Sequence, residues 1–150
     1  MKRPAPPSAR PTSILVVDDD EGHAILIRSN LEAAGLPNPI EHFRDGQAVL
    51  DSFASDASRA SGTYIALLDI RMPKVDGIEV LRRMKADPAL KKLPVIMLTT
   101  TDDQREVERC HQLGCSGYIQ KPVDYEKFAE AIRRIGLFVP LLLVPQVGAA

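Results

Sequence analysis

The sequence predicts an α/β domain with a doubly wound, five-stranded parallel sheet flanked by five helices, and two observations lead to this prediction. Short, continuous apolar runs recur along the chain, and they alternate with longer segments whose apolar residues step by three or four. A short run without polar residues is typical of a strand that is buried on both faces, as in a parallel sheet covered by helices.

The first strand and the first helix are clearly marked. Residues 14–17 are the apolar run Ile-Leu-Val-Val, and Asp20 after them can cap a helix. The apolar positions of that helix are Ala24, Ile27, Leu31 and Ala34. Gly35 is placed to end it.

The same alternation continues through the rest of the domain. We expect further strands at residues 38–43, 64–68, 95–98 and 117–119, and further helices at residues 45–55, 75–85, 102–113 and 124–135. Residues 56–63 form a polar loop before the third strand, and Gly114 ends the fourth helix. Strands that are joined by helices in this way lie parallel, with helices on both faces of the sheet.

The chain divides into one domain and two tails. Residues 1–11 are rich in proline and basic side chains, so they cannot bury a core, and we expect a disordered tail. Residues 12–136 form the domain, and residues 137–150 form an apolar C-terminal arm.

Composition excludes several classes of function. Nineteen basic and twenty acidic side chains leave a formal charge of −1, which favours neither a DNA partner nor a membrane surface. No signal peptide is recognisable, and two cysteines, Cys110 and Cys115, suggest reduced thiols in a cytoplasmic protein. Their five-residue spacing does not place two zinc ligands, with His111, on one face of a helix.

Polar side chains follow four of the predicted strands. Asp18 and Asp19 follow the first strand, Asp69 the third, Thr99 the fourth and Lys121 the fifth. Each by itself has an ordinary explanation, such as a turn, a strand end or a surface charge. Because ligands of doubly wound folds bind beyond the carboxyl ends of the strands, we expect these residues to lie close together.

A group of three carboxylates needs compensation for its charge. At about 5 Å and an effective dielectric near 20, each pair repels by roughly 3 kcal/mol. Mg²⁺ offsets this repulsion with oxygen ligands and leaves a carboxylate oxygen of Asp69 available as a phosphoryl acceptor. Lys121 can then supply a positive charge, and Thr99 can supply a hydroxyl donor.

Four segments resemble the receiver domains of two-component response regulators. They are Val-Val-Asp-Asp-Asp at residues 16–20, Asp-Ile-Arg-Met-Pro-Lys-Val-Asp-Gly at residues 69–77, Leu-Pro-Val-Ile-Met-Leu-Thr at residues 93–99, and Gly-Tyr-Ile-Gln-Lys-Pro at residues 117–122. The second is the most specific, and the resemblance spans residues 12–136. It implies a CheY-like fold with strand order 2-1-3-4-5.

The resemblance also implies roles for the site residues. Asp69 would accept a phosphoryl group from a sensor histidine kinase. Asp19 would bind Mg²⁺ directly, Asp18 mainly through water, and the backbone carbonyl of Arg71 would add a further protein ligand. Thr99 and Lys121 would bind the phosphoryl oxygens.

Two conformational features follow from the same resemblance. Thr99 and Tyr118 would act as the switch, with Tyr118 rotating inward after Thr99 moves toward the phosphoryl group. The peptide bond before Pro122 would be cis, although cis bonds are only about 5–6% of X-Pro bonds in folded proteins.

The C-terminal arm is strongly apolar and should not stay in water. Its apolar residues are Leu137, Phe138, Val139, Leu141, Leu142, Leu143 and Val144. The arm can pack on its own domain, or it can exchange with a second copy in a homodimer. We favour exchange, because Pro140 favours an extended segment. A stand-alone receiver with such an arm resembles the small regulators that partner bacteriophytochrome histidine kinases.

Two other classes of function remain as alternatives to a signalling acceptor that turns over no external substrate. A metal-dependent phosphatase can also form an aspartyl phosphate, but such enzymes typically have a second Asp where this chain has Arg71. A phosphorylation-independent interaction module would have no use for Thr99 and Lys121 beside the carboxylates.

Overall fold

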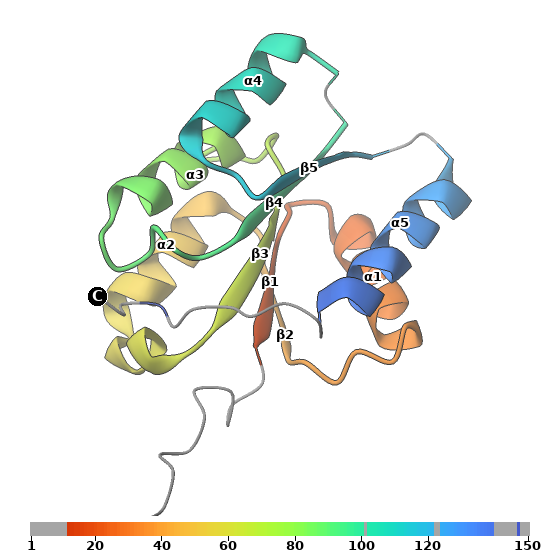
Figure 1. Ribbon diagram of the computed structural model, residues 1–150, viewed down its shortest axis with the longest axis horizontal. Coiled ribbons are helices and arrows are strands. Elements are labelled where there is room, and N and C mark those ends of the chain that lie inside the picture. Colours follow the sequence, from red (N-terminus) through yellow and green to blue (C-terminus); the bar gives the residue numbers. More distant parts are fainter. Residues whose placement is uncertain (1–11, 101, 122–123, 140–146, 148–150) are drawn as a thin grey trace, which may run out of the picture.

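The protein is described here by a computed structural model that covers residues 12–100, 102–121, 124–139 and 147. Five parallel strands form one sheet in the order β2-β1-β3-β4-β5, which confirms the predicted fold class and strand order (Figure 1). The strands are β1 (Ser13–Val17), β2 (Ile40–Phe43), β3 (Tyr64–Leu68), β4 (Val95–Thr99) and β5 (Gly117–Gln120).

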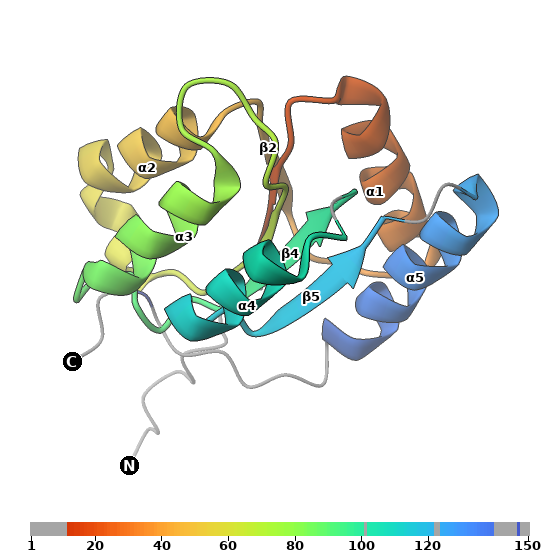
Figure 2. The same cartoon turned by 90° about the horizontal axis from the view of Figure 1, so that it is seen from above.

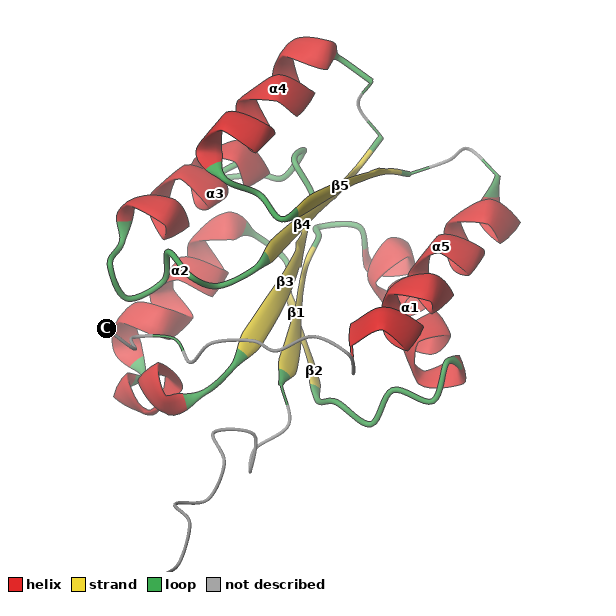
Figure 3. Cartoon of the chain, viewed as in Figure 1, coloured by secondary structure: helices red, strands yellow, loops and turns green. Residues whose placement is uncertain are grey.

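Helices cover both faces of this sheet, as the alternation of segments predicted. The helices are α1 (Glu21–Ala33), α2 (Gly46–Ser55), α3 (Gly77–Ala86), α4 (Gln104–Leu113) and α5 (Tyr125–Phe138), and a short 3₁₀ helix, η2 (Ala57–Ser61), follows α2. Figure 2 shows α1 and α5 on one face and α2, α3 and α4 on the other. The sheet is therefore the middle layer of three (Figure 3).

An aspartate caps each of the five α-helices at its N-terminus. The caps are Asp20, Asp45, Asp76, Asp103 and Asp124, and each side chain accepts a hydrogen bond from a backbone N–H of the first turn. Such a bond satisfies one of the N–H groups that a helix leaves without a partner. Because the caps lie just outside the helices, α2 to α5 begin one or two residues later than predicted.

Three further differences from the predicted elements have local causes. Strand β2 begins at Ile40, because the preceding Asn38 turns its side-chain amide to the Thr12 carbonyl oxygen, at 2.7 Å. The loop of residues 56–63 contains η2, since Asp56 accepts a hydrogen bond from the Ser58 N–H and caps it. Helix α5 continues three residues beyond residue 135, so the prediction of an arm that begins at residue 137 was wrong in its first two residues.

Gly136 lies inside α5, where a helix end was expected, because the helix packs closely on α1. A Cβ at Gly136 would lie 2.9 Å from the Ala34 Cβ and 3.4 Å from Leu31 Cδ2. A glycine in a helix interior lowers stability by about 1 kcal/mol relative to alanine. At Gly136 a larger side chain would instead press against α1.

The core consists of two clusters, one on each face of the sheet. Along β1, Leu15 and Val17 belong to the cluster under α2, α3 and α4, whereas Ile14 and Val16 belong to the cluster under α1 and α5. All four side chains are at most 1% exposed. The alternation follows from the two-residue period of a strand, and it explains why the run is continuous in sequence.

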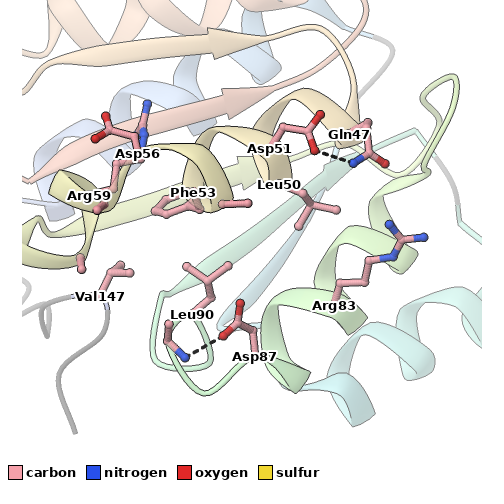
Figure 4. A pocket seen from close by; sticks show the side chains of 14 residues that line it. Gln47, Leu50, Asp51, Phe53, Asp56, Arg59, Arg83, Asp87, Leu90 and Val147 are labelled. Atoms are coloured by element: carbon pink, nitrogen blue, oxygen red, sulfur yellow. Dashed lines mark hydrogen bonds between the residues drawn. The ribbon is translucent and has the colours of Figure 1, made fainter.

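The described C-terminal residues contact both core clusters. Val139 belongs to the cluster under α1 and α5, whereas Val147 belongs to the opposite cluster and donates its N–H to the Gly62 carbonyl oxygen at 3.0 Å. Figure 4 shows Val147 beside Leu90 in a pocket of about 340 Å³ between α2, η2 and the loop after α3. Leu137 and Phe138 are 65% and 57% exposed on α5.

Some predicted features lie outside the described residues. These are the proline-rich tail of residues 1–11, the arm residues Leu141, Leu142, Leu143 and Val144, and Pro122 with the peptide bond before it. Within the described part of the chain, no helix combines the length and the apolar character that a membrane span requires.

Candidate functional site

Three carboxylates lie together at the carboxyl ends of β1 and β3. Asp18, Asp19 and Asp69 each offer an oxygen, and these oxygens lie within 4.8 Å of one another. Asp18 and Asp69 are buried, whereas Asp19 is exposed to solvent. Among the residues that the structure describes, this is the one group of three or more potential His, Cys, Asp or Glu ligands that could hold a metal ion.

The position of these residues follows from the register of the sheet. Val17 pairs with Leu68 as the last residues of the adjacent strands β1 and β3, so Asp18 and Asp69 come next on both strands. The Asp69 N–H donates to the Val17 carbonyl oxygen at 3.0 Å and continues the ladder by one step. Backbone hydrogen bonds therefore hold the two carboxylates side by side in spite of the repulsion between their charges.

Asp18 is fixed by three further hydrogen bonds. Its Oδ1 accepts the Asp20 N–H at 2.9 Å, and its Oδ2 accepts from the Lys121 ammonium at 2.7 Å. His42, near the end of β2, places Nε2 2.8 Å from the Asp18 carbonyl oxygen. Both oxygens of the Asp18 carboxylate are thus already engaged within the protein.

Lys121 follows β5 and is only 6% exposed, so it is not a surface charge. Its Nζ contacts Asp18 Oδ2 at 2.7 Å, His23 Nδ1 at 3.0 Å and Asp69 Oδ2 at 3.4 Å. Its backbone N–H donates to the Thr99 carbonyl oxygen at 2.7 Å. Three side chains, Asp18, His23 and Asp69, therefore meet around one ammonium group, as the sequence predicted for Asp18, Asp69 and Lys121.

Burial makes the charge of Asp69 costly. Removal from water raises the pKa of Asp69 above its ordinary value, and the nearby Asp18 carboxylate raises it further, while Lys121 opposes both effects. A buried carboxylate that retains an unfavourable charge is stabilised by any additional cation. Such perturbation by burial and by specific neighbours is typical of functional sites.

Gly77 allows the loop after β3 to close tightly on Asp69. A Cβ at this position would lie 2.0 Å from the Asp69 carbonyl oxygen, closer than atoms can approach, so only glycine fits. The Gly77 N–H donates to the Ile70 carbonyl oxygen at 2.8 Å, and Lys74 within the loop has a positive φ of 67°. The Asp-Gly pair of the sequence motif thus combines a helix cap with a close backbone contact.

Arg71 lies two residues after Asp69 and directs its side chain away from the carboxylates. The guanidinium forms an ion pair with Glu106 on α4, and the arginine side chain is 66% exposed. The loop that carries Asp69 is thereby tied to α4. This side-chain contact leaves the predicted role of the Arg71 backbone carbonyl as a metal ligand untouched.

Thr99 and Tyr118 lie on the same face of the sheet. Met97 pairs with Tyr118 in the β4–β5 register, and Thr99 lies two residues further along β4. Thr99 is fully buried, and Tyr118 is half-buried with its ring 6.4 Å from the His111 ring. Burial, with Cys110 and Glu106 nearby, raises the pKa of Tyr118 to about 12, so its hydroxyl remains protonated at neutral pH.

Sequence reasoning missed two histidines at this site. His23 contacts Lys121 from the first turn of α1, and His42 contacts the Asp18 backbone from β2. The sequence held one signal for His23: it lies three residues after the capping Asp20, and the third residue of a helix lies near its cap and therefore near the end of β1. The contact of His42 depends on the register in which β2 pairs with β1, and no local sequence pattern gives that register.

The donor set fits a hard divalent cation. The oxygens are all carboxylate, one of the three side chains is open to solvent, and Mg²⁺ in proteins prefers one or two carboxylates with water for the remaining positions. The thiols are different: Cys110 is buried, Cys115 is half-buried, and neither forms a disulfide. The contact of Cys115 Sγ with His111 Nδ1, at 3.8 Å, brings no carboxylate with it.

Comparison with known proteins decides the family. The model of the response regulator receiver domain matches residues 14–133. The chain belongs to this family. The probable methanogenesis regulatory protein FilR2 of Methanothrix harundinacea is 36% identical over 126 residues, which are 83% of this chain and 81% of that protein.

Solved structures agree with this assignment. The response regulator receiver domain from Rhodospirillum rubrum is 42% identical, with a TM-score of 0.87 and coverage of 92% of this chain and 100% of that chain. The bacteriophytochrome response regulator RtBRR is 34% identical, with a TM-score of 0.69 and coverage of 91% of this chain and 85% of that chain. This receiver domain is therefore similar to regulators of bacteriophytochrome systems.

Asp69→Asn should increase the free energy of unfolding at neutral pH without divalent cations. Because the pKa of Asp69 is raised in the folded state, the folded wild type binds a proton more readily than the unfolded chain does. Its free energy of unfolding therefore falls as the pH rises from the ordinary aspartate range through the folded-state pKa, whereas an amide at this position does not titrate. Urea denaturation in EDTA at pH 7.5 and pH 4 measures this, and the gain should shrink at the lower pH. Asp51→Asn, on the exposed face of α2, is the matched control. An Asp69 variant that is less stable than the wild type at pH 7.5 would contradict the electrostatic argument.

Proposed function

We propose that this receiver domain accepts a phosphoryl group on Asp69 from the phosphohistidine of a sensor histidine kinase. The observation that carries the proposal is the buried Asp69 carboxylate, with two more carboxylates and a buried ammonium beside it. A purely structural role would favour fewer buried charges, because burial of ions is costly even when they are paired. The arrangement suits a reaction in which negative charge arrives at Asp69.

Magnesium is the cofactor that we propose for this reaction. Asp19 and Asp69 would bind it directly, and the backbone carbonyl of Arg71 would add a further ligand. Asp18 would act mainly through water, because its two carboxylate oxygens already accept hydrogen bonds from Asp20 and Lys121. When bound, the ion neutralises the clustered carboxylates and the phosphoryl oxygens.

The transfer itself requires little besides position and charge. An oxygen of Asp69 forms a bond to phosphorus as the bond between phosphorus and the kinase imidazole nitrogen breaks, and the nitrogen takes up a proton. Lys121, 3.4 Å from Asp69 Oδ2, supplies a positive charge to the phosphoryl oxygens. The Thr99 hydroxyl would donate a hydrogen bond to another of them. These contacts stabilise charge that develops during transfer.

A bacteriophytochrome is the sensor kinase that we propose as partner. RtBRR, which carries the name of such a system, matches nearly the whole of this chain at 34% identity. The acceptor role itself needs only the site, whereas the identity of the kinase depends on surfaces around it. Phosphotransfer from a purified bacteriophytochrome kinase, compared with an unrelated histidine kinase, tests this part.

Neither alternative function is favoured by a specific contact. The residue two positions after Asp69 is Arg71, and its guanidinium, which pairs with Glu106, cannot replace the carboxylic acid that a phosphatase has there. A module that works without phosphorylation would have no use for the buried Asp69 carboxylate, whose charge Lys121 compensates only in part. A signalling acceptor accounts for both residues.

Incubation with acetyl phosphate and Mg²⁺ should add one phosphoryl group to the wild type and none to Asp69→Asn. The amide lacks the nucleophilic oxygen, while the fold remains intact. Intact-mass spectrometry measures the addition, and EDTA should abolish it. Asp51→Asn should be labelled like the wild type. Labelling of Asp69→Asn at the wild-type level would refute the proposal.

We also propose that phosphorylation is transmitted through Thr99 and Tyr118. Thr99 would move toward the phosphoryl group, and the half-buried Tyr118 would rotate into the vacated space. The common face of the two residues and the backbone bond from Lys121 to Thr99 support this coupling. The affected surface would be that of α4, β5 and α5.

Beryllofluoride with Mg²⁺ should therefore change the side-chain NMR signals of Tyr118. The signals should move by more than those of Tyr64, which is 8% exposed at the start of β3 and lies away from the site. Selective labelling of tyrosine rings makes the measurement possible in a chain with three tyrosines. Tyr118 signals that stay unchanged while beryllofluoride binds would exclude this switch.

A homodimer joined by exchanged C-terminal arms is the assembly that we propose. Val147 occupies a place in the core cluster under α2 and α3, and its N–H pairs with Gly62. Val147 of a second copy can occupy the same position in the core cluster, since exchange of an identical segment preserves every contact. The exposed Leu137 and Phe138 at the end of α5 would be covered in such a dimer.

Removal of residues 140–150 should convert the dimer to a monomer and leave α5 intact. Sedimentation velocity over a range of concentrations measures the change. Val147→Asp should weaken the dimer in the same direction, because a carboxylate would replace a side chain that is 3% exposed. A truncated chain that sediments as the full-length dimer would refute exchange through the arm.

A further inference from the structure

We propose that His23 is a positioning residue, which holds the Lys121 ammonium in place for the incoming phosphoryl group. The inference deepens the proposed function and depends on it. Nothing in the sequence motifs assigns a role to His23, yet its Nδ1 lies 3.0 Å from Lys121 Nζ. That contact is shorter than the contact between Lys121 and the acceptor Asp69.

The imidazole is held in place from two sides. The His23 backbone N–H donates to the capping Asp20 Oδ1 at 3.0 Å, which fixes the residue in the first turn of α1. The ring lies edge-on to Phe128 of α5, with 6.0 Å between centroids and an angle of 70°. Phe128 is 3% exposed, and a buried aromatic neighbour restricts the rotation of the ring. The nitrogen that faces Lys121 is therefore presented in a defined direction.

The hydrogen bonds of Lys121 determine the tautomer of His23. A lysine ammonium has three N–H donors and no acceptor, so Nδ1 must accept and the ring proton must lie on Nε2. The three donors match three acceptors: Asp18 Oδ2 at 2.7 Å, His23 Nδ1 at 3.0 Å and Asp69 Oδ2 at 3.4 Å. The longest bond is the one to Asp69, and it is the bond that an arriving phosphoryl oxygen would replace.

His23 differs from the other two acceptors because an imidazole nitrogen that accepts a hydrogen bond carries no negative charge. Asp18 and Asp69 attract the ammonium strongly, and both also serve the proposed metal and phosphoryl chemistry. The His23 nitrogen directs one ammonium proton without adding negative charge to a site that already holds three carboxylates. It can therefore keep its bond to Lys121 while the carboxylates exchange partners.

Loss of this acceptor should slow phosphorylation. Without His23, the acceptors that remain for the Lys121 ammonium among the described residues are the carboxylates of Asp18 and Asp69, so Lys121 pairs more tightly with them. The phosphoryl group then has to displace a stronger ion pair. A hydrogen bond to a charged group contributes enough to change a rate by about tenfold.

Two substitutions separate the acceptor from the packing of the ring. His23→Asn retains an oxygen at the position of Nδ1, because both atoms are bonded to Cγ. His23→Leu has the same branching at Cγ but no acceptor. The maximal rate of phosphorylation by acetyl phosphate at saturating Mg²⁺ should fall about tenfold in the leucine variant and less than about threefold in the asparagine variant.

Each result decides the inference. Equal rates for the wild type and both variants would overturn it, and so would equal losses in both, which would indicate a role in packing alone. ¹⁵N NMR of the histidine rings in the wild type is an independent measurement, expected to show His23 with its proton on Nε2. A proton on Nδ1 at neutral pH would overturn the inference even if the leucine variant does not fold. A wild type that is never labelled would contradict the proposed function, whereas the tautomer would still test the contact.

Discussion

The interaction on which the rest of the structure depends is the contact of one buried ammonium, Lys121, with the carboxylates of Asp18 and Asp69. The sheet register brings the two acids together by backbone bonds alone, and their repulsion would otherwise act against folding. Lys121 offsets part of that repulsion but leaves the charge of Asp69 costly, as its raised pKa indicates. The site thus retains negative charge that is not fully compensated, and a bound cation would stabilise it.

The layers of the domain place each group around that ammonium. Strands β1 and β3 are neighbours in the sheet and place the two acids, while Lys121, the first residue after β5, contacts both acids with its side chain. Helix α1 packs on α5 at Gly136 near the ends of both helices and at His23 and Phe128 near their starts. The position of His23 at the site therefore depends on contact between two helices as well as on the sheet.

Communication away from the site can use the same contacts. The Lys121 backbone is bonded to Thr99, and the Arg71 side chain ties the acceptor loop to Glu106 of α4. Both connections lead toward the face of α4, β5 and α5, which also carries the exposed end of α5 with Leu137 and Phe138. The acceptor Asp69 is thus connected through bonded residues to the surface of α4, β5 and α5.

The sequence by itself determined the fold class, the strand order by resemblance, and the presence of Asp18, Asp69 and Lys121 at strand ends, because apolar runs and helix periods are local patterns. Only the tertiary structure decided that α5 passes through Gly136, that Lys121 is buried against Asp18, and that His23 is its third acceptor. These features depend on helix packing and on contacts between distant residues: Lys121 is 103 positions from Asp18 and 98 positions from His23 in the chain. No periodicity or motif records such separations, since they arise from the way the layers meet.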